Sequence, residues 1–182
     1  IADVLFGHYN PSGKLPMVFP RSVGQVPIYY AQKNTGRPGP QKAVFWSHYT
    51  DSPNSPLYPF GFGLSYTQFD YSAIELSEPD ISLDGEIQVA VTLTNSGKYD
   101  GAEVVQLYIR DLVASNTRPL KELKGFAKVF LKVGESRRVE FTLGPDKLGF
   151  YANDGSYRIE LGEFHVFVGG SSQDVQQASF KL

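Results

Sequence analysis

Between residues 45 and 51 the chain reads FWSHYTD, the stretch whose side chains are best suited to contact a small polar ligand. It combines aromatic rings with an imidazole and a carboxylate, and an arginine lies nearby upstream. Sugars need such a mixture, because their C–H faces pack on rings while their hydroxyls need fixed polar partners. The candidate substrate-binding residues are therefore Arg37, Trp46, His48, Tyr49 and Asp51. Packing between two domains is the alternative explanation of the same residues.

Catalytic chemistry has no comparable candidate elsewhere in the sequence. Most aspartates sit in or beside turns and most glutamates on the polar phase of expected strands, so no carboxylate pair is evident. Ser65 lacks the second glycine of a nucleophile elbow, and Tyr66 stands where a dinucleotide fingerprint would need its third glycine. The three histidines show no metal-ligand spacing, and cysteine is absent. We therefore predict no catalytic residue, no cofactor and no metal site in this chain.

Length and charge narrow the partners that the chain could have. Of its 182 residues 41% are hydrophobic and 20% are charged, which is an ordinary globular composition. A net charge of −2 without a basic stripe gives no reason to expect nucleic acid. No apolar run reaches the length of a membrane-spanning helix, so no membrane partner is expected either. The opening IADVLF reads like the end of a helix, and we expect the chain to be part of something larger.

From Phe69 onward the hydrophobic pattern has a period of two, which is typical of half-buried strands. Alternation is clear at 87–94, 105–110, 139–143 and 164–168, and further strands are expected at 71–76, 123–131, 157–161 and 178–182. Glycine-containing turns between these runs are expected to supply positive φ. The pattern predicts a mainly β fold, an immunoglobulin- or fibronectin type III-like sandwich of two antiparallel sheets. The predicted interior contains Val89, Val91, Leu107, Ile109, Phe141, Val166 and Val168.

The part before this pattern is irregular. Residues 21–56 are rich in proline and glycine but also in aromatic residues, which favours an ordered loop over a disordered linker. Residues 57–69, LYPFGFGLSYTQF, place large rings around Gly61 and Gly63. We interpret this stretch as a junction clamped between two packed bodies, although it could also be an aromatic first strand of a single domain.

Four motifs in this order resemble the C-terminal portion of glycoside hydrolase family 3, and most closely its bacterial periplasmic β-glucosidases. They are NPSGKLPMVFP at 10–20, PLYPFGFGLSYTQF at 56–69, TNSGKYDGAEVVQLYIRD at 94–111 and RPLKELKGFAKVFLKVGES at 118–136. The resemblance implies that residues 1–20 end an α/β-sandwich domain, that 21–68 form the connecting loop and junction, and that 69–182 form a fibronectin type III-like domain.

The resemblance also implies a function. Family members are retaining glycosidases that act on terminal β-D-glucosyl or related residues, with an Asp nucleophile in a barrel domain and usually a Glu acid/base in the α/β-sandwich domain. Both residues lie upstream of the matched portion, so the chain alone is predicted to be inactive and to support the catalytic domains. The implied partners are those two domains and a β-linked glucoside or oligosaccharide, in the periplasm or secreted. A homodimer is an open alternative to a monomer.

The match is imperfect in the candidate loop. Many family members carry an Arg and an aromatic residue followed by Asp before the YPFG motif. In this sequence Tyr49 and Asp51 match, while His48 takes the arginine position and Thr50 replaces a common aromatic residue. An independent carbohydrate-binding or adhesion module of β-sandwich type therefore remains the alternative function, and a complete small enzyme is a third.

Overall fold

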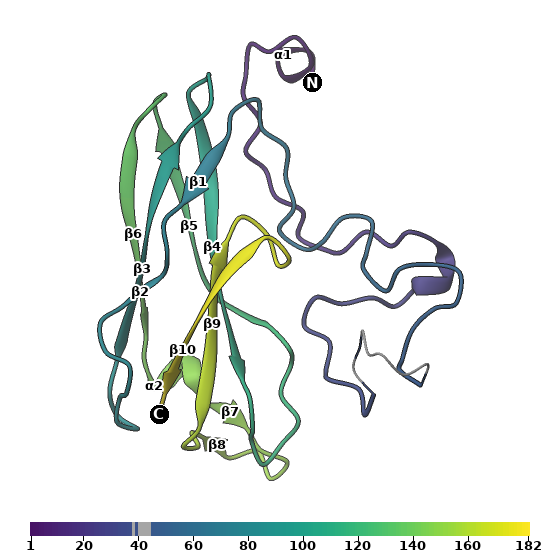
Figure 1. Ribbon diagram of the computed structural model, residues 1–182, viewed down its shortest axis with the longest axis vertical. Coiled ribbons are helices and arrows are strands. Elements are labelled where there is room, and N and C mark those ends of the chain that lie inside the picture. The colour runs from purple at the N-terminus through teal and green to yellow at the C-terminus, as the bar shows by residue number, and fades with distance from the viewer. Residues whose placement is uncertain (38, 40–44) are drawn as a thin grey trace.

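The computed structural model describes residues 1–37, 39 and 45–182, and its strands build a sandwich of two antiparallel sheets (Figure 1). In the first sheet, β1 and β2 pair with one edge of β3 while β6 pairs with the other edge; the second sheet has the order β10-β9-β4-β5. The bounds of the first sheet are β1 Phe69–Tyr71, β2 Glu75–Leu76, β3 Ile87–Asn95 and β6 Ser136–Leu143. Those of the second are β4 Gly101–Asp111, β5 Glu122–Leu131, β9 Glu163–Gly169 and β10 Val175–Lys181. A short helix, α2 (Pro145–Leu148), leads to a small hairpin of β7 (Phe150–Tyr151) and β8 (Tyr157–Arg158). The predicted fold class is confirmed.

The four clearest alternating runs all fall in strands, β3, β4, β6 and β9. The weaker predictions are less accurate in their bounds. The run expected at 71–76 divides into β1 and β2, and the strand expected at 157–161 is only the two residues of β8.

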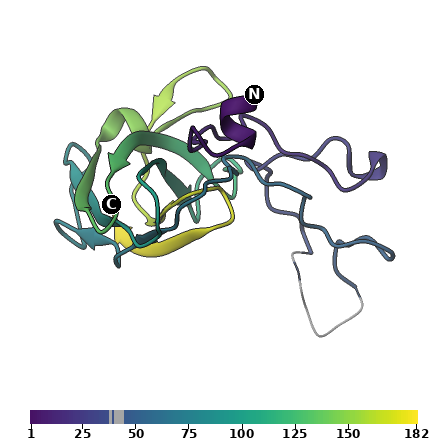
Figure 2. The same cartoon turned by 90° about the horizontal axis from the view of Figure 1, so that it is seen from above.

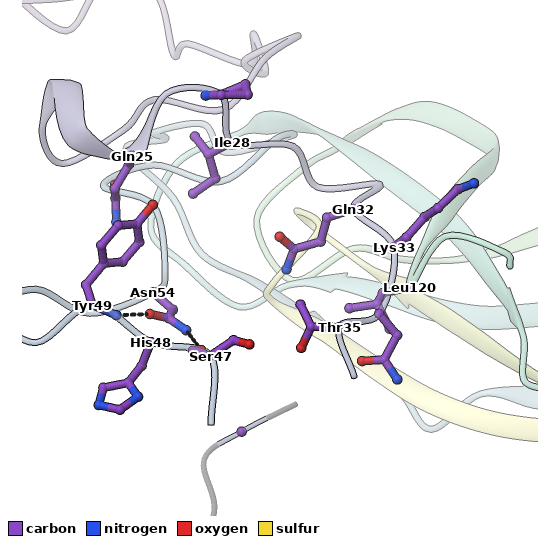
Figure 3. Close-up of a pocket in the computed structure, with 13 residues that line it drawn as sticks. Gln25, Ile28, Gln32, Lys33, Thr35, Ser47, His48, Tyr49, Asn54 and Leu120 are labelled. Atoms are coloured by element: carbon purple, nitrogen blue, oxygen red, sulfur yellow. Dashed lines mark hydrogen bonds between the residues drawn. The ribbon is translucent and has the colours of Figure 1, made fainter. Parts of the chain in front are cut away.

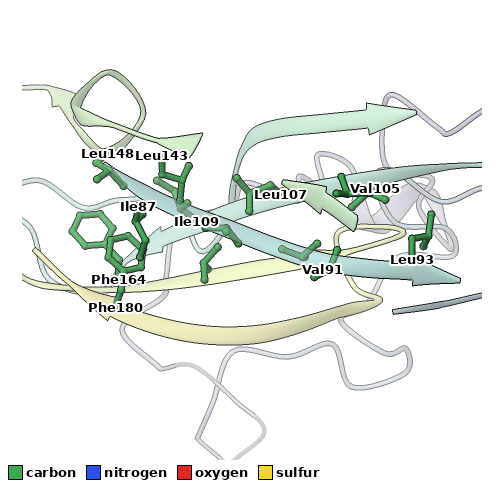
Figure 4. Close-up of a cluster of buried hydrophobic side chains, with 14 of the residues drawn as sticks. Ile87, Val91, Leu93, Val105, Leu107, Ile109, Leu143, Leu148, Phe164 and Phe180 are labelled. Atoms are coloured by element: carbon green, nitrogen blue, oxygen red, sulfur yellow. The ribbon is translucent and has the colours of Figure 1, made fainter. Parts of the chain in front are cut away.

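Inward-facing side chains of both sheets form one hydrophobic core (Figure 4). Val89, Val91 and Leu107 are almost fully buried, as are the predicted residues of β9. Phe141 packs against this core but stays partly exposed. Full burial of each such aliphatic side chain stabilises the fold by roughly 1.5–3 kcal/mol, so the core is the main source of stability.

Three of the turn glycines act differently from the prediction. Of the turn glycines after residue 80, Gly134 and Gly155 have positive φ, near 75° and 80°. Gly85, Gly97 and Gly101 do not. A β-carbon on Gly97 would collide with Thr67, and one on Gly101 with Asn10. Gly97 and Gly101 therefore permit close packing against the junction and the N-terminal segment rather than a reversal of φ.

The N-terminal segment begins with a helical turn, α1 (Ala2–Leu5), and Gly7 follows it with φ near 79°. This agrees with a helix end capped by glycine. Residues 14–19 pair with the junction, because the Leu15 amide donates to the Phe62 carbonyl and the Gly61 amide donates to the Leu15 carbonyl, both at 2.8 Å. Within the described residues, no helix is long and apolar enough to cross a membrane.

Candidate functional site

The described residues between 21 and 56, called the arm below, project from the sandwich as an extended double run of chain (Figures 1 and 2). Apart from a 3-10 turn, η1 (Val23–Gln25), its described residues contain no helix and no strand. The side chain of Gln25 ties its two sides together. Its Nε2 donates to the carbonyl oxygens of Pro53 (2.9 Å) and Ser55 (3.3 Å), while its Oε1 accepts from the Arg21 amide (2.7 Å). Gln25 is only 2% exposed, so the arm is organised around a buried amide and not around an apolar core.

Two of the predicted residues stack on each other. The rings of Trp46 and His48 lie 4.2 Å apart at 19°, and the Nδ1 of His48 is 2.7 Å from the Trp46 carbonyl oxygen. The backbone of Gly39 lies against the indole, so closely that a β-carbon on Gly39 would overlap the ring. Trp46 is half-buried in this arrangement, whereas His48 is exposed. The indole thus fixes the imidazole in position.

Beside this stack, residues of the arm and Leu120 of the sandwich line an open cavity of about 440 Å³ (Figure 3). Asn54 holds one wall, because its Oδ1 accepts from the Tyr49 amide at 3.1 Å and its Nδ2 donates to the Ser47 carbonyl at 2.7 Å. The lining joins apolar groups with amides, hydroxyls and one ammonium group. Its side chains include Ile28, Gln32, Lys33, Thr35, His48, Tyr49, Asn54 and Leu120.

The cavity unites some of the predicted residues and leaves others outside. His48 and Tyr49 line it, and Trp46 supports His48 from behind. Arg37 is joined to the same stretch through its carbonyl, which accepts from the Ser47 amide at 3.0 Å. Asp51 is exposed and is not among the described residues that line the cavity.

The composition of this lining limits its chemistry. Amides and hydroxyls can bind sugar hydroxyls, and the mixture of polar and apolar groups suits a sugar ring. None of the described lining residues is Asp or Glu, whereas retaining glycoside hydrolysis requires two carboxyl groups. Within the described residues no group of three or more metal-ligating side chains is arranged to hold a metal ion. Among its described residues this lining therefore offers hydrogen-bonding and apolar groups that suit a sugar, but no carboxyl group.

Polar and aromatic contacts at the base of the arm fix its position relative to the sandwich. The Nε2 of Gln106, on β4, donates to the carbonyl oxygens of Gly61 (3.2 Å) and Gly170 (2.7 Å). The ring of Tyr30 stacks on Phe60 at 4.2 Å and meets Tyr108 edge-on at 5.8 Å. Burial of the Tyr108 ring raises the pKa of its hydroxyl. The junction predicted at 57–69 therefore contacts both the arm and the sandwich.

The sandwich also contributes Lys121 at this base. Its Nζ donates to the Ser172 carbonyl and lies 4.8 Å above the Phe167 ring, and burial lowers the pKa of the ammonium group. The neighbouring Leu120 amide donates to the Gln32 carbonyl at 2.9 Å. No sequence pattern points to Gln25, Gln106 or Lys121, since the role of each depends on contacts between distant segments.

Comparison with known proteins agrees with this architecture. Residues 1–66 match the glycosyl hydrolase family 3 C-terminal domain, and residues 103–172 match a fibronectin type III-like domain. A periplasmic beta-glucosidase of Salmonella typhimurium is 52% identical over the whole chain, which covers 24% of that relative. A beta-xylosidase of Formosa agariphila is 47% identical over 95% of the chain and 23% of its own length.

Solved structures give the same result. The beta-glucosidase from Listeria innocua in complex with glucose superposes with a TM-score of 0.94 at 43% identity, over 99% of this chain and 25% of that one. The chain thus spans about a quarter of the length of the relatives that it matches. Its two matched regions, in this order and on this fold, assign the chain to glycoside hydrolase family 3, as the C-terminal part that carries the fibronectin type III-like domain.

Proposed function

We propose that the chain is the non-catalytic C-terminal part of a β-glucosidase that removes terminal β-D-glucosyl, or related β-glycosyl, residues with retention. The observation that carries this proposal is the similarity to β-glucosidases along the entire chain, which covers only a quarter of their length. Because a β-xylosidase is almost as similar, the proposal includes related β-glycosides. The match of residues 1–66 to a hydrolase domain favours this role over an independent carbohydrate-binding module.

In this proposal the catalytic carboxyl groups come from the barrel and α/β-sandwich domains, on which the chain packs. Retention needs two carboxyl groups about 5 Å apart, and the arm cavity offers none among its described residues. Large apolar side chains are widely exposed in the hydrolase-matched part, for example Phe6 (78%), Val23 (89%) and Leu64 (71%). Exposed apolar surface of this extent supports packing against a further protein surface. The name of the Salmonella relative supports a periplasmic or secreted location.

The activity can be tested with the intact parent enzyme and the 182-residue chain side by side. We expect the parent to hydrolyse an aryl β-glucoside and to release β-glucose first, as followed by proton NMR of the anomeric signals. The chain alone is expected to give no turnover above background. Turnover by the chain alone that disappears when one of its own carboxylates is changed would overturn the proposal, as would release of α-glucose by the parent.

We further propose that the arm lies at the rim of the sugar cleft, in the same subunit or across a dimer contact. Its aromatic stack and hydroxyl-binding side chains suit the distal part of an oligosaccharide, which would help to orient the substrate. In the intact enzyme, Trp46→Ala should weaken binding of a β-linked oligosaccharide by about 1 kcal/mol, because His48 loses its support. A small aryl glucoside does not reach the rim and should keep its KM.

Tyr151→Ala is the matched control for this measurement, because Tyr151 is also aromatic and is 74% exposed, but lies on β7 of the sandwich. Its KM should be unchanged for both substrates. If Trp46→Ala raised both KM values equally and also lowered the melting temperature, Trp46 would be a packing residue between domains.

A further inference from the structure

The outer face of β5 carries an apolar strip that the sandwich itself does not use. Val129 and Leu131 of this strand are buried, whereas Phe126 and Phe130 are 69% and 53% exposed. Side chains two and four residues apart on a strand point to the same face, so the two phenylalanines lie on one side with Lys128 between them. Since β5 is also the edge of its sheet, two large rings are presented at a sheet margin.

This strip continues a face that is already covered. In the β4–β5 register Phe126 lies opposite Gln106, whose side chain is 3% exposed because the Gly61 and Gly170 carbonyls accept its hydrogen bonds. The next outward residue of β4, Tyr108, is fully buried, and the ring of Tyr30 packs against it. Gly61 and Tyr30, which both lie within residues 1–66, thus cover the outward face of β4. The same face of the neighbouring strand β5 stays exposed.

We propose that Phe126 and Phe130 extend this interface and that the catalytic part of the same polypeptide covers them in the intact enzyme. This inference rests on the proposed function, because the covering part belongs to the three quarters of the relatives' length that the chain does not span. Residues 1–66, which match the hydrolase domain, already contact this face of the sandwich, since the Gly61 carbonyl accepts from Gln106. Two phenylalanine rings bury a large apolar area, which makes them suitable anchors of such an interface.

Other occupants fit the strip less well. A sugar chain needs a flat platform, but the rings are four residues apart, about 13 Å along the strand, and the exposed Lys128 stands between them. Edge-to-edge pairing with a second copy is disfavoured by lysines on an edge strand, and β5 carries Lys124 as well as Lys128. A protein surface that surrounds each ring separately is compatible with both features.

Hydroxyl-radical footprinting of the unmodified intact enzyme and of the 182-residue chain tests this inference without any substitution. Oxidation of each ring is measured by mass spectrometry of its peptide, with Tyr151 as the exposed aromatic control. In the intact enzyme Phe126 and Phe130 should react about tenfold more slowly than in the chain alone, while Tyr151 should react equally in both. Equal reactivity of the phenylalanines in both samples would overturn the inference, and so would protection that vanishes on dilution, which would indicate a second copy.

A pair of substitutions gives an independent readout. Phe126→Ser should lower the melting temperature of the intact enzyme but leave that of the chain alone nearly unchanged, because the ring is exposed there. Tyr151→Ser should be neutral in both. The aryl-glucosidase assay on the same samples separates the two proposals. An active enzyme with reactive phenylalanines overturns only this inference, whereas an inactive enzyme with protected ones overturns only the proposed function.

Discussion

Glu103 is a buried acid at the point where the N-terminal segment meets the sandwich. Its Oε1 lies 2.6 Å from the Nζ of Lys14, and the side chains are 9% and 16% exposed, respectively. The hydroxyl of Tyr71 is buried in the same cluster; burial raises its pKa, and the nearby Glu103 and Asp174 carboxylates raise it further. Burial raises the pKa of Glu103 above its ordinary value more than the Lys14 ammonium lowers it.

This pKa predicts how stability depends on pH. A carboxyl group whose pKa is raised in the folded state contributes stability below its unfolded pKa, and this contribution is lost as pH rises through the folded pKa. Glu103→Gln imitates the protonated form. We therefore expect the free energy of unfolding of the E103Q variant to improve relative to the unmodified chain as pH rises above about 4.5. Urea unfolding at pH 4.5 and 7 measures this difference.

Glu135 provides a control, because its pKa is shifted in the opposite direction to that of Glu103. It is partly exposed, and hydrogen bonds from the Lys132 amide and Arg137 lower its pKa. The stability that it contributes is present above its unfolded pKa. The free energy of unfolding of the E135Q variant should therefore fall relative to that of the unmodified chain as pH rises. If E103Q and E135Q changed with pH in the same direction, the assignment of burial as the dominant effect at Glu103 would be wrong.

At the scale of elements, the sandwich could be predicted because its signal is local. The alternation of apolar and polar residues in β3, β4, β6 and β9 indicates which side chains enter the core. A shift of register by one residue would expose all of these side chains. Gly97 and Gly101 show where local reasoning ends, since a β-carbon on them would collide with Thr67 and Asn10, respectively, which are both distant in the sequence. The same limit explains why β1 and β2 were expected as one strand.

The arm could be predicted in composition but not in shape. FWSHYTD predicts an aromatic and polar contact surface; in the structure His48 and Tyr49 line one cavity, and Trp46 stacks on His48. The buried Gln25 that organises the arm has no periodic pattern, because its hydrogen bonds join carbonyls about thirty residues away. Side-chain amides bonded to distant carbonyls leave no trace in hydrophobic periodicity.

At the scale of the whole molecule, the chain has two parts of very different local stability. The sandwich contains the core, whereas Gln25 is the only buried residue among the described residues of the arm. The few backbone hydrogen bonds of the arm include those from the Gln25, Val26 and Ser47 amides. Segments with few buried contacts open at low free energy cost, while core strands open only near global unfolding.

This contrast predicts a specific pattern of hydrogen exchange. In the 182-residue chain, amides of the arm should exchange rapidly, and those of β3 and β4 should be protected because both strands pair on two edges and line the core. In the intact enzyme β3 and β4 should keep their protection. The arm amides should become slower, because a partner domain at the rim would cover them and supply the contacts that the arm lacks. An arm that exchanges equally fast in both proteins would show that it does not dock in the parent enzyme, and its aromatic stack would then have to be assigned to a solvent-exposed role.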